Sequence, residues 1–114
     1  MRYMSNATGA QGEFDAAEYL KKKKYKILAK NYKNKLGEID IIAKDKDYIV
    51  FIEVKTRSSL AFGRPSEAVT PAKQHKVQLA AQVYLKQERL TDQPCRFDVI
   101  EVLDDKINHI ENAF

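Results

Sequence analysis

The sequence predicts an α/β fold in which a mixed central sheet is flanked by helices. Two segments carry apolar residues at helical spacing, and the other ordered segments are rich in β-branched and aromatic residues. Two consecutive strand segments are apolar on both faces, which is typical of strands in the middle of a covered sheet. The predicted order is αβββαβ with a short final strand: a helix at 8–24, strands at 25–34, 36–43 and 48–56, a helix at 71–87, and strands at 96–103 and 107–110.

The two helices are indicated by their ends as well as by their periodicity. In the first, Thr8 is a candidate N-cap, and the predicted inward stripe contains Ala10, Phe14, Ala17 and then Leu20 or Lys21. The second has a capping threonine followed by proline at the first helical position. Its predicted buried residues are Val77, Ala80, Ala81 and Tyr84, with Leu85 beside them.

The polar residues 44–47 separate the two apolar strands and predict a hairpin turn. We expect a loop with an even number of residues, centred on Asp45 and Lys46, which places Asp40 opposite Phe51. In that register Asp40 and Glu53 are diagonal neighbours on one face, at about 7 Å between their backbones. An odd loop would place them on opposite faces, unless a bulge compensated.

Three charged side chains of this hairpin have a spacing that suits phosphodiester hydrolysis. Lys55 follows Glu53 by two residues and shares its face, while Asp40 lies on the neighbouring strand. Asp40 and Glu53 can hold Mg²⁺, or Mn²⁺ in its place, and such an ion polarises a phosphoryl oxygen and activates a water. Lys55 can stabilise the negative charge that develops or position the attacking water. The alternative is a surface hairpin whose ion pairs contribute about 0–1 kcal/mol.

Glu13 is a further candidate catalytic residue on the first helix. It lies next to Phe14, on or beside the inward stripe. A carboxylate there needs a partner, because burying an unpaired charge is costly. Glu13 can pair with a lysine, reach the metal directly or through water, or lean toward solvent at the edge of the core.

Candidate substrate-binding residues flank the hairpin. Lys73 and Gln74 begin the second helix, where a helix N-terminus and basic side chains can bind phosphate. Thr56 and Arg57, followed by Ser58 and Ser59, supply hydrogen-bond donors directly after the second carboxylate strand. An ordinary polar helix face and an ordinary polar loop explain the same residues. The histidines, His75 and His109, have no ligand partners at recognisable spacing and are predicted to lie at the surface.

Length and composition limit the class of protein. A chain of 114 residues predicts one domain, spanning 1–114, with a core that needs no disulfide or structural metal. The formal net charge of +4 permits a polyanionic partner without demanding one. No apolar run has the length of a membrane span or the form of a signal peptide, so we expect a cytoplasmic protein that does not bind membranes.

These residues resemble the PD-(D/E)xK nuclease superfamily, which has the restriction-endonuclease-like fold. More narrowly, the chain is similar to the YraN family of small bacterial proteins. The matching segments cover most of the chain in order: GEFDAAEYL, NYKNKLGEIDIIAKD, YIVFIEVKTRSS, FGRPSEAVTPAKQHKV and RFDVIEV. Ile39 stands where the superfamily's name has proline.

The resemblance implies a restriction-endonuclease-like αβββαβ core with specific roles for the charged residues. Asp40 and Glu53 would be Mg²⁺ ligands, and Lys55 the catalytic lysine. Archaeal Holliday-junction resolvases share this architecture and use an additional glutamate from the first helix, which matches Glu13. In the superfamily a Gln or Lys near the start of the second helix often assists the active site.

The sequence therefore predicts a metal-dependent endonuclease that acts on DNA, including branched or structured DNA. The alternative is a non-catalytic nucleic-acid-binding or interaction module that retains the nuclease fold. The presence of all four charged residues favours the enzyme, because a buried carboxylate pair without a metal is costly. A homodimer would allow two cuts on a symmetric junction, although no segment identifies its interface.

Overall fold

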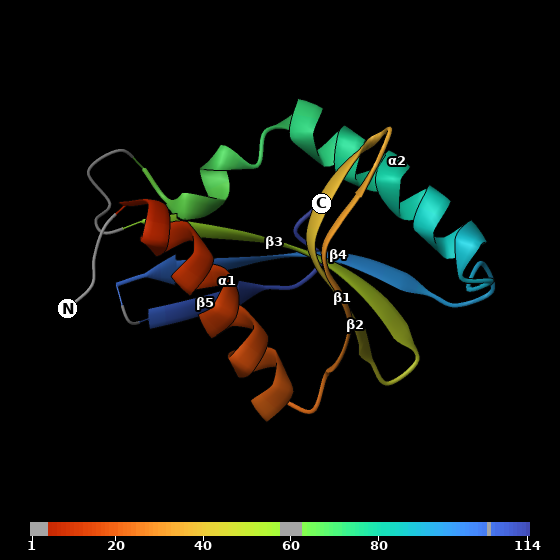
Figure 1. Cartoon of the computed structure of the whole chain (residues 1–114), viewed down its shortest axis with the longest axis horizontal. Helices are drawn as coiled ribbons and strands as arrows, with labels where there is room; N and C mark the ends of the chain where they lie inside the picture. Colours follow the sequence, from red (N-terminus) through yellow and green to blue (C-terminus); the bar gives the residue numbers. More distant parts are fainter. Residues whose placement is uncertain (1–4, 58–62, 105) are drawn as a thin grey trace.

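The structure, a computed structural model, describes residues 5–57, 63–104 and 106–114 (Figure 1). Its elements follow the predicted order, and the predicted mixed α/β fold is confirmed. They are α1 (Ser5–Lys22), β1 (Lys26–Asn34), β2 (Gly37–Asp45), β3 (Tyr48–Arg57), the short 3₁₀ helix η1 (Pro65–Ala68), α2 (Pro71–Gln87), β4 (Cys95–Leu103) and β5 (Lys106–Ile110).

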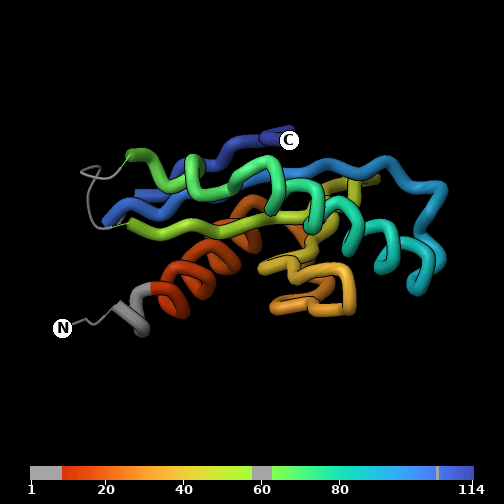
Figure 2. The backbone as a smooth tube through the Cα atoms, turned by 90° about the horizontal axis from the view of Figure 1, so that it is seen from above, coloured from red at the N-terminus to blue at the C-terminus, as the bar shows by residue number. Residues whose placement is uncertain are grey.

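The five strands form one mixed sheet in the order β1-β2-β3-β4-β5. β3 and β4 are parallel, and the other neighbouring strands are antiparallel. A parallel pair needs a crossover connection, which α2 supplies here. β3 and β4 run side by side along the length of the molecule in both views (Figures 1 and 2). This arrangement is compatible with a restriction-endonuclease-like core.

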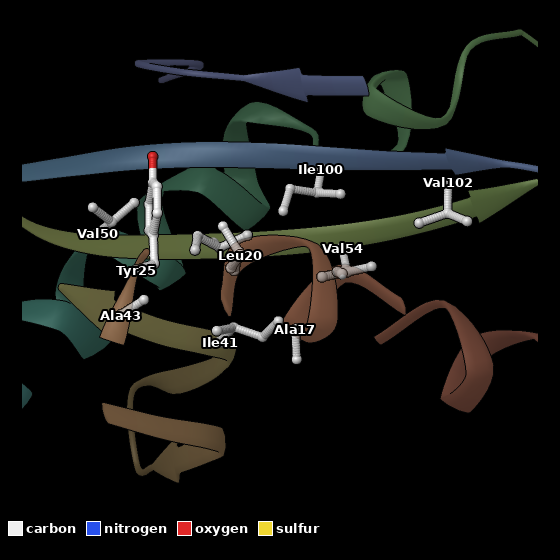
Figure 3. Close-up of a cluster of buried hydrophobic side chains, with 11 residues drawn as sticks. Ala17, Leu20, Tyr25, Ile41, Ala43, Val50, Val54, Ile100 and Val102 are labelled. Atoms are coloured by element: carbon white, nitrogen blue, oxygen red, sulfur yellow. The ribbon is translucent and has the colours of Figure 1, made fainter. Parts of the chain in front are cut away.

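Each face of the sheet is covered by one helix, so the protein has two hydrophobic clusters. On the α1 face, Val50 and Val54 of β3 pack with Leu20 and with Ile100 of β4 (Figure 3). The cluster on the α2 face consists of Ile39, Ile42, Ile49, Phe51, Val77, Ala80, Ala81 and Tyr84. β3 is therefore buried on both faces, as its two-sided apolar pattern predicts. Any polar side chain in the middle of β3 is buried with it.

The start and the inward face of α1 differ from the prediction. The helix begins at Ser5, so Thr8 lies inside it and is not its N-cap. Phe14 is 55% exposed, whereas Ala16, Ala17 and Leu20 are buried. One turn earlier the buried stripe continues at Gly12, and Glu13 beside it is half-buried, whereas Ala10 and Phe14 are exposed. The helix thus turns Glu13 closer to the sheet than the expected stripe would.

The second helix agrees with the prediction at both ends. It spans Pro71–Gln87, and the Thr70 side chain accepts a hydrogen bond from the backbone N–H of Lys73 at 3.3 Å. The N-cap and the following proline therefore fix the start of the helix. Its buried residues are Val77, Ala80, Ala81 and Tyr84.

The β2–β3 loop has the predicted even length, but the predicted register was wrong by two residues. Asp45 pairs with Tyr48, so the loop consists of Lys46 and Asp47, and Phe51 faces Ile42 instead of Asp40. Lys46 adopts a left-handed φ of 56°, as turn residues often do. The turn is centred on Lys46 and Asp47, one residue later than the predicted centre at Asp45 and Lys46. An ion pair between the Asp45 carboxylate and Arg96 (3.3 Å) helps to keep Asp45 in the ladder.

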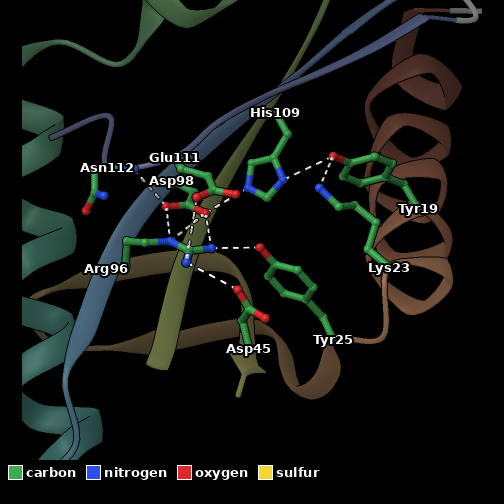
Figure 4. A network of polar contacts seen from close by, with 9 residues as sticks. All are labelled: Tyr19, Lys23, Tyr25, Asp45, Arg96, Asp98, His109, Glu111 and Asn112. Carbon is green, nitrogen blue, oxygen red and sulfur yellow. Dashed lines mark hydrogen bonds and ion pairs between the residues drawn. The ribbon is translucent and has the colours of Figure 1, made fainter. Parts of the chain in front are cut away.

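A buried polar network joins β4 and β5 to α1, and His109 belongs to it (Figure 4). The Asp98 carboxylate accepts a hydrogen bond from Arg96 Nε at 3.0 Å and lies 2.7 Å from His109 Nε2. Burial alone would raise the pKa of Asp98, but the hydrogen bonds from His109 and Arg96 outweigh it and lower that pKa. His109 Nδ1 lies 3.2 Å from the Tyr19 hydroxyl. The predicted surface role of His109 was wrong, because its side chain is only 4% exposed.

α1 is in close contact with β3 at a glycine. A Cβ added to Gly12 would overlap Thr56 Oγ1 and lie 3.3 Å from Thr56 Cβ. Gly9, one turn earlier, has no heavy atom within 4 Å of the same built position. The absence of a side chain at Gly12 therefore sets the distance between the helix that carries Glu13 and the strand that carries Lys55.

We expect Gly12→Ala to destabilise the protein by about 1–3 kcal/mol, because the added methyl group overpacks the contact with Thr56. The matched control Gly9→Ala should raise stability by up to about 1 kcal/mol through helix propensity alone. Urea unfolding monitored by circular dichroism measures both. Equal stabilisation by the two substitutions would show that the Gly12–Thr56 contact does not limit the approach of α1.

Candidate functional site

The candidate site lies where β2 separates from β3. The ladder between them runs from the Asp45–Tyr48 pair to the Ile41–Ile52 pair, although both strands continue beyond it. Just past the last pair, the Asp40 carboxylate accepts a hydrogen bond from the backbone N–H of Val54 at 2.8 Å. The backbone N–H of Asp40 in turn donates to Glu53 Oε2 at 3.4 Å. The two carboxylates thus take the place of ladder hydrogen bonds, and the structure brings them together.

Glu53 is the most deeply buried member of the site. Its side chain is 1% exposed, and its Oε1 atom is buried with no hydrogen-bond partner among the residues that the structure describes. Burial, together with the negative charge of Asp40, raises the pKa of Glu53 to about 7, although Lys73 and Lys55 oppose the shift. In the protein without a bound cation, this carboxyl therefore exchanges its proton near neutral pH.

The same factors act on Asp40. Burial raises its pKa, and the nearby Glu38 adds to that effect. The hydrogen bond from the Val54 N–H and the positive charge of Lys55 act in the opposite direction. A buried carboxyl and a half-buried one that repel each other favour positive charge at the site.

Glu13 on α1 lies beside this pair without completing a three-carboxylate site. Burial and the charge of Asp40 raise the pKa of Glu13, while Lys30 and Lys55 lower it. Within residues 5–57, 63–104 and 106–114, no three His, Cys, Asp or Glu side chains are placed to hold one metal ion. Glu13 therefore stands outside the carboxylate pair and can act on it through water or by its charge.

The lysines of the site come from different elements. Lys55 follows Glu53 on β3 and influences the pKa of all three acidic residues. Lys73, in the first turn of α2, places its Nζ 3.5 Å from Glu53 Oε1. The structure thus brings Lys73 to the carboxylates, next to the oxygen that has no hydrogen bond.

Other candidate residues lie around the site in different roles. Gln74 Nε2 donates to the backbone carbonyl of Val69 at 3.0 Å, so its amide is bound to the segment before α2. Thr56 lies against Gly12, and Arg57 Nη1 donates to the carbonyl of Thr56 at 3.1 Å. Ser58 and Ser59 lie outside the described residues.

Lys30 is a charged neighbour that the sequence did not reveal. It pairs with Ile41 across the β1–β2 ladder, which places it near Asp40 and Glu13. Its position depends on an irregularity in β1, where the register shifts between Ile27 and Ala29. Nothing in the local sequence gives this shift, so the proximity of Lys30 could be found only from the structure.

The structure and the sequence comparisons together identify the class and the family. The fold and site define a mixed α/β protein in which a buried carboxylate, Glu53, and a half-buried one, Asp40, lie beside lysines where two strands separate. The sequence model of the Uncharacterised protein family UPF0102 matches residues 12–102, and the chain belongs to this family. This result confirms the resemblance to the YraN family. None of the helices in the described part of the chain is long and apolar enough to cross a membrane.

Relatives of nearly the same length occur in several bacteria. A UPF0102 protein of Caldanaerobacter subterraneus subsp. tengcongensis is 53% identical and covers 93% of each chain. One from Alkaliphilus oremlandii is 55% identical and covers 97% of this chain and 100% of its own. A third, from Clostridium botulinum strain Loch Maree, is 48% identical over 100% of this chain and 98% of its own.

The raised pKa of Glu53 predicts how stability changes with pH in the presence of a chelator. The folded protein keeps the Glu53 proton up to about pH 7, whereas the unfolded chain releases it near the ordinary value of 4.5. The contribution of Glu53 to stability is therefore fully present below about pH 4.5 and is lost as pH rises through 7. The loss amounts to as much as about 3 kcal/mol.

Urea unfolding in EDTA between pH 5 and 8.5 measures this effect. We expect Glu53→Gln to lose less stability than the wild type over that range, because its side chain does not ionise. The control Glu88→Gln, at an exposed position after α2, should follow the wild-type curve. Parallel curves for wild type and Glu53→Gln would contradict the raised pKa of Glu53.

Proposed function

We propose that the protein is a metal-dependent endonuclease that hydrolyses phosphodiester bonds of DNA, including branched or structured DNA. The observation that carries the proposal is the buried Oε1 atom of Glu53, which forms no hydrogen bond among the described residues and has only the ion-pair contact with Lys73 at 3.5 Å. It lies on a carboxylate that contacts Asp40 across the strand gap. The resemblance of these residues to the PD-(D/E)xK nuclease superfamily supports the same activity.

The residues present fit a hard divalent cation. Asp40 and Glu53 would hold Mg²⁺ or Mn²⁺, because carboxylate oxygens are the ligands that such ions prefer. The Asp40 and Glu53 carboxylates repel each other, and Glu53 Oε1 is buried without a hydrogen bond, so a nearby positive charge would stabilise both carboxylates. When bound, the ion would polarise a phosphoryl oxygen and lower the pKa of a water molecule.

The remaining charged residues of the chain would supply positioning and electrostatic stabilisation. Hydrolysis joins a water oxygen to phosphorus and breaks the bond from phosphorus to the leaving oxygen, which takes up a proton. Lys55 would stabilise the negative charge that develops on the phosphoryl group. Glu13, whose carboxyl is partly exposed on α1, would orient the attacking water and accept its proton. Thr56 and Arg57 would contact the substrate beyond Lys55.

A second function is favoured by one specific observation. Lys73 Nζ lies 3.5 Å from Glu53 Oε1 and supplies a positive charge to the buried carboxylate without a metal. A protein with that internal ion pair could bind nucleic acid and leave it intact. The two functions differ in whether a divalent cation competes with Lys73 for Glu53.

The metal requirement can be tested without measuring activity. We expect Mg²⁺ or Mn²⁺ to raise the melting temperature of the wild type at pH 8, because an ion that binds only the folded state stabilises it. At a hundredfold excess over Kd the gain is about 2.7 kcal/mol. For a domain of this size each kcal/mol corresponds to about 4–8 °C. Glu53→Gln and Asp40→Asn should show little of this shift, and an equal shift in both variants would exclude the carboxylate pair as the binding site.

Activity is tested with a panel of substrates in Mg²⁺ or Mn²⁺: duplex, flapped, single-stranded and four-way-junction DNA, each with its RNA counterpart. We expect the wild type to cut at least one DNA substrate. Lys55→Ala should reduce the rate by about a hundredfold or more, because it removes charge stabilisation in the transition state. The control Lys86→Ala, at the far end of α2, should cut at the wild-type rate. Binding without cleavage by the wild type would instead support the non-catalytic function.

A further inference from the structure

A cleft of about 430 Å³ lies between the β1–β2 turn and the start of α2. Its volume is in the range of small-ligand sites, but its lining differs from theirs, since such sites are mostly apolar. Four lysines contribute to the wall, two from the β1–β2 turn region (Lys33 and Lys35) and two from α2 (Lys73 and Lys76). Glu38 is the acidic residue of the lining.

Close packing holds the two walls of the cleft in place. A Cβ added to Gly37 would lie 2.9 Å from the carbonyl oxygen of Lys76, so the turn rests directly on the backbone of α2. Asn34 Nδ2 donates to the carbonyl of Ala80 at 3.3 Å, which ties the end of β1 to the same helix. The lysines of the cleft therefore lie on two elements, the β1–β2 turn and α2, that are packed against each other. The side chains of Lys33, Lys35 and Lys76 are exposed to solvent.

The positive charge of the cleft is largely uncompensated. Lys33, Lys35 and Lys76 are exposed, and none of them forms an ion pair within 4.0 Å in the part of the chain that the structure describes. Four lysines around one glutamate create a positive local potential, which favours anionic ligands. Among the described residues the lining contains no aromatic side chain, so these residues offer phosphate contacts and no stacking on bases.

The cleft adjoins the carboxylate site. Lys73 lines the cleft and also pairs with Glu53. Glu38 lines it as well, and its charge acts on Asp40. A nucleic-acid backbone that reached the carboxylates through the cleft would therefore pass Lys73 first.

We propose that this cleft binds the sugar–phosphate backbone of a nucleic-acid strand next to the bond that is cut, with Lys33, Lys35 and Lys76 as phosphate contacts. The inference rests on the proposed nuclease function and adds the surface along which the substrate runs. Contacts to phosphate position a strand without reading its sequence. The cleft thus gives affinity that is independent of base sequence and strongly dependent on salt.

The test compares two triple variants with the same change in net charge. The cleft variant is Lys33→Gln, Lys35→Gln and Lys76→Gln, and the control variant is Lys26→Gln, Lys44→Gln and Lys86→Gln, whose lysines are exposed elsewhere. Fluorescence anisotropy with labelled single-stranded and duplex DNA in EDTA, at several salt concentrations, measures binding without cleavage. Circular dichroism shows that each variant is folded.

We expect the cleft variant to bind at least about tenfold more weakly, because it loses up to three phosphate contacts. Its slope of log affinity against log salt should shrink by about 0.7–0.9 for each lost contact. The control variant should keep the wild-type slope. Equal weakening of both variants, or wild-type binding by the cleft variant, would overturn the proposed role of the cleft.

Cleavage by the wild type in Mg²⁺, measured on the same DNA, separates this outcome from failure of the proposed function. If the wild type cuts while the cleft variant binds normally, the cleft assignment is wrong and the nuclease function stands. If the wild type neither binds nor cuts DNA or RNA, both proposals are wrong.

Discussion

The separation of β2 from β3 is the feature on which the rest of the site depends. Past the Ile41–Ile52 pair, backbone N–H groups of both strands would lack ladder partners, and the carboxylates of Asp40 and Glu53 accept two of them. β3 is buried on both faces at this point, so the divergence places a carboxylate inside the protein. The cost of burying that charge is visible in the raised pKa of Glu53.

The flanking elements bring further charged residues to this carboxylate pair, and each element is fixed by a local constraint. The Thr70 cap sets the start of α2, which brings Lys73 within 3.5 Å of Glu53. The missing side chain of Gly12 lets α1 lie against Thr56, which keeps Glu13 near Asp40. The packing of Gly37 on α2 forms the lysine-lined cleft next to the site. Residues from α1, β2, β3 and α2 therefore meet at the point where β2 and β3 separate.

Much of the fold could be predicted from the sequence, because periodicity and end signals act locally. The order of the elements and the start of α2 at Thr70–Pro71 followed from such patterns. The register of the hairpin did not, since an ion pair to Arg96 on a distant strand helps to keep Asp45 in the ladder. The burial of His109 likewise depends on Asp98 from the neighbouring strand and on Tyr19 from α1. Nothing in the local sequence distinguishes Lys33 and Lys35 from other surface lysines. They line a cleft only because the β1–β2 turn packs against α2.

We propose that Asp40 and the buried Glu53, at the point where β2 and β3 separate, form a site for a divalent cation. Crystals of the wild-type protein grown or soaked in Mn²⁺ would test it by anomalous scattering, which locates the ion directly. We predict an anomalous peak beside Glu53 Oε1 and the Asp40 carboxylate, with Lys73 Nζ displaced from Glu53. Crystals that show no peak there, with the Lys73–Glu53 ion pair intact, would contradict the claim.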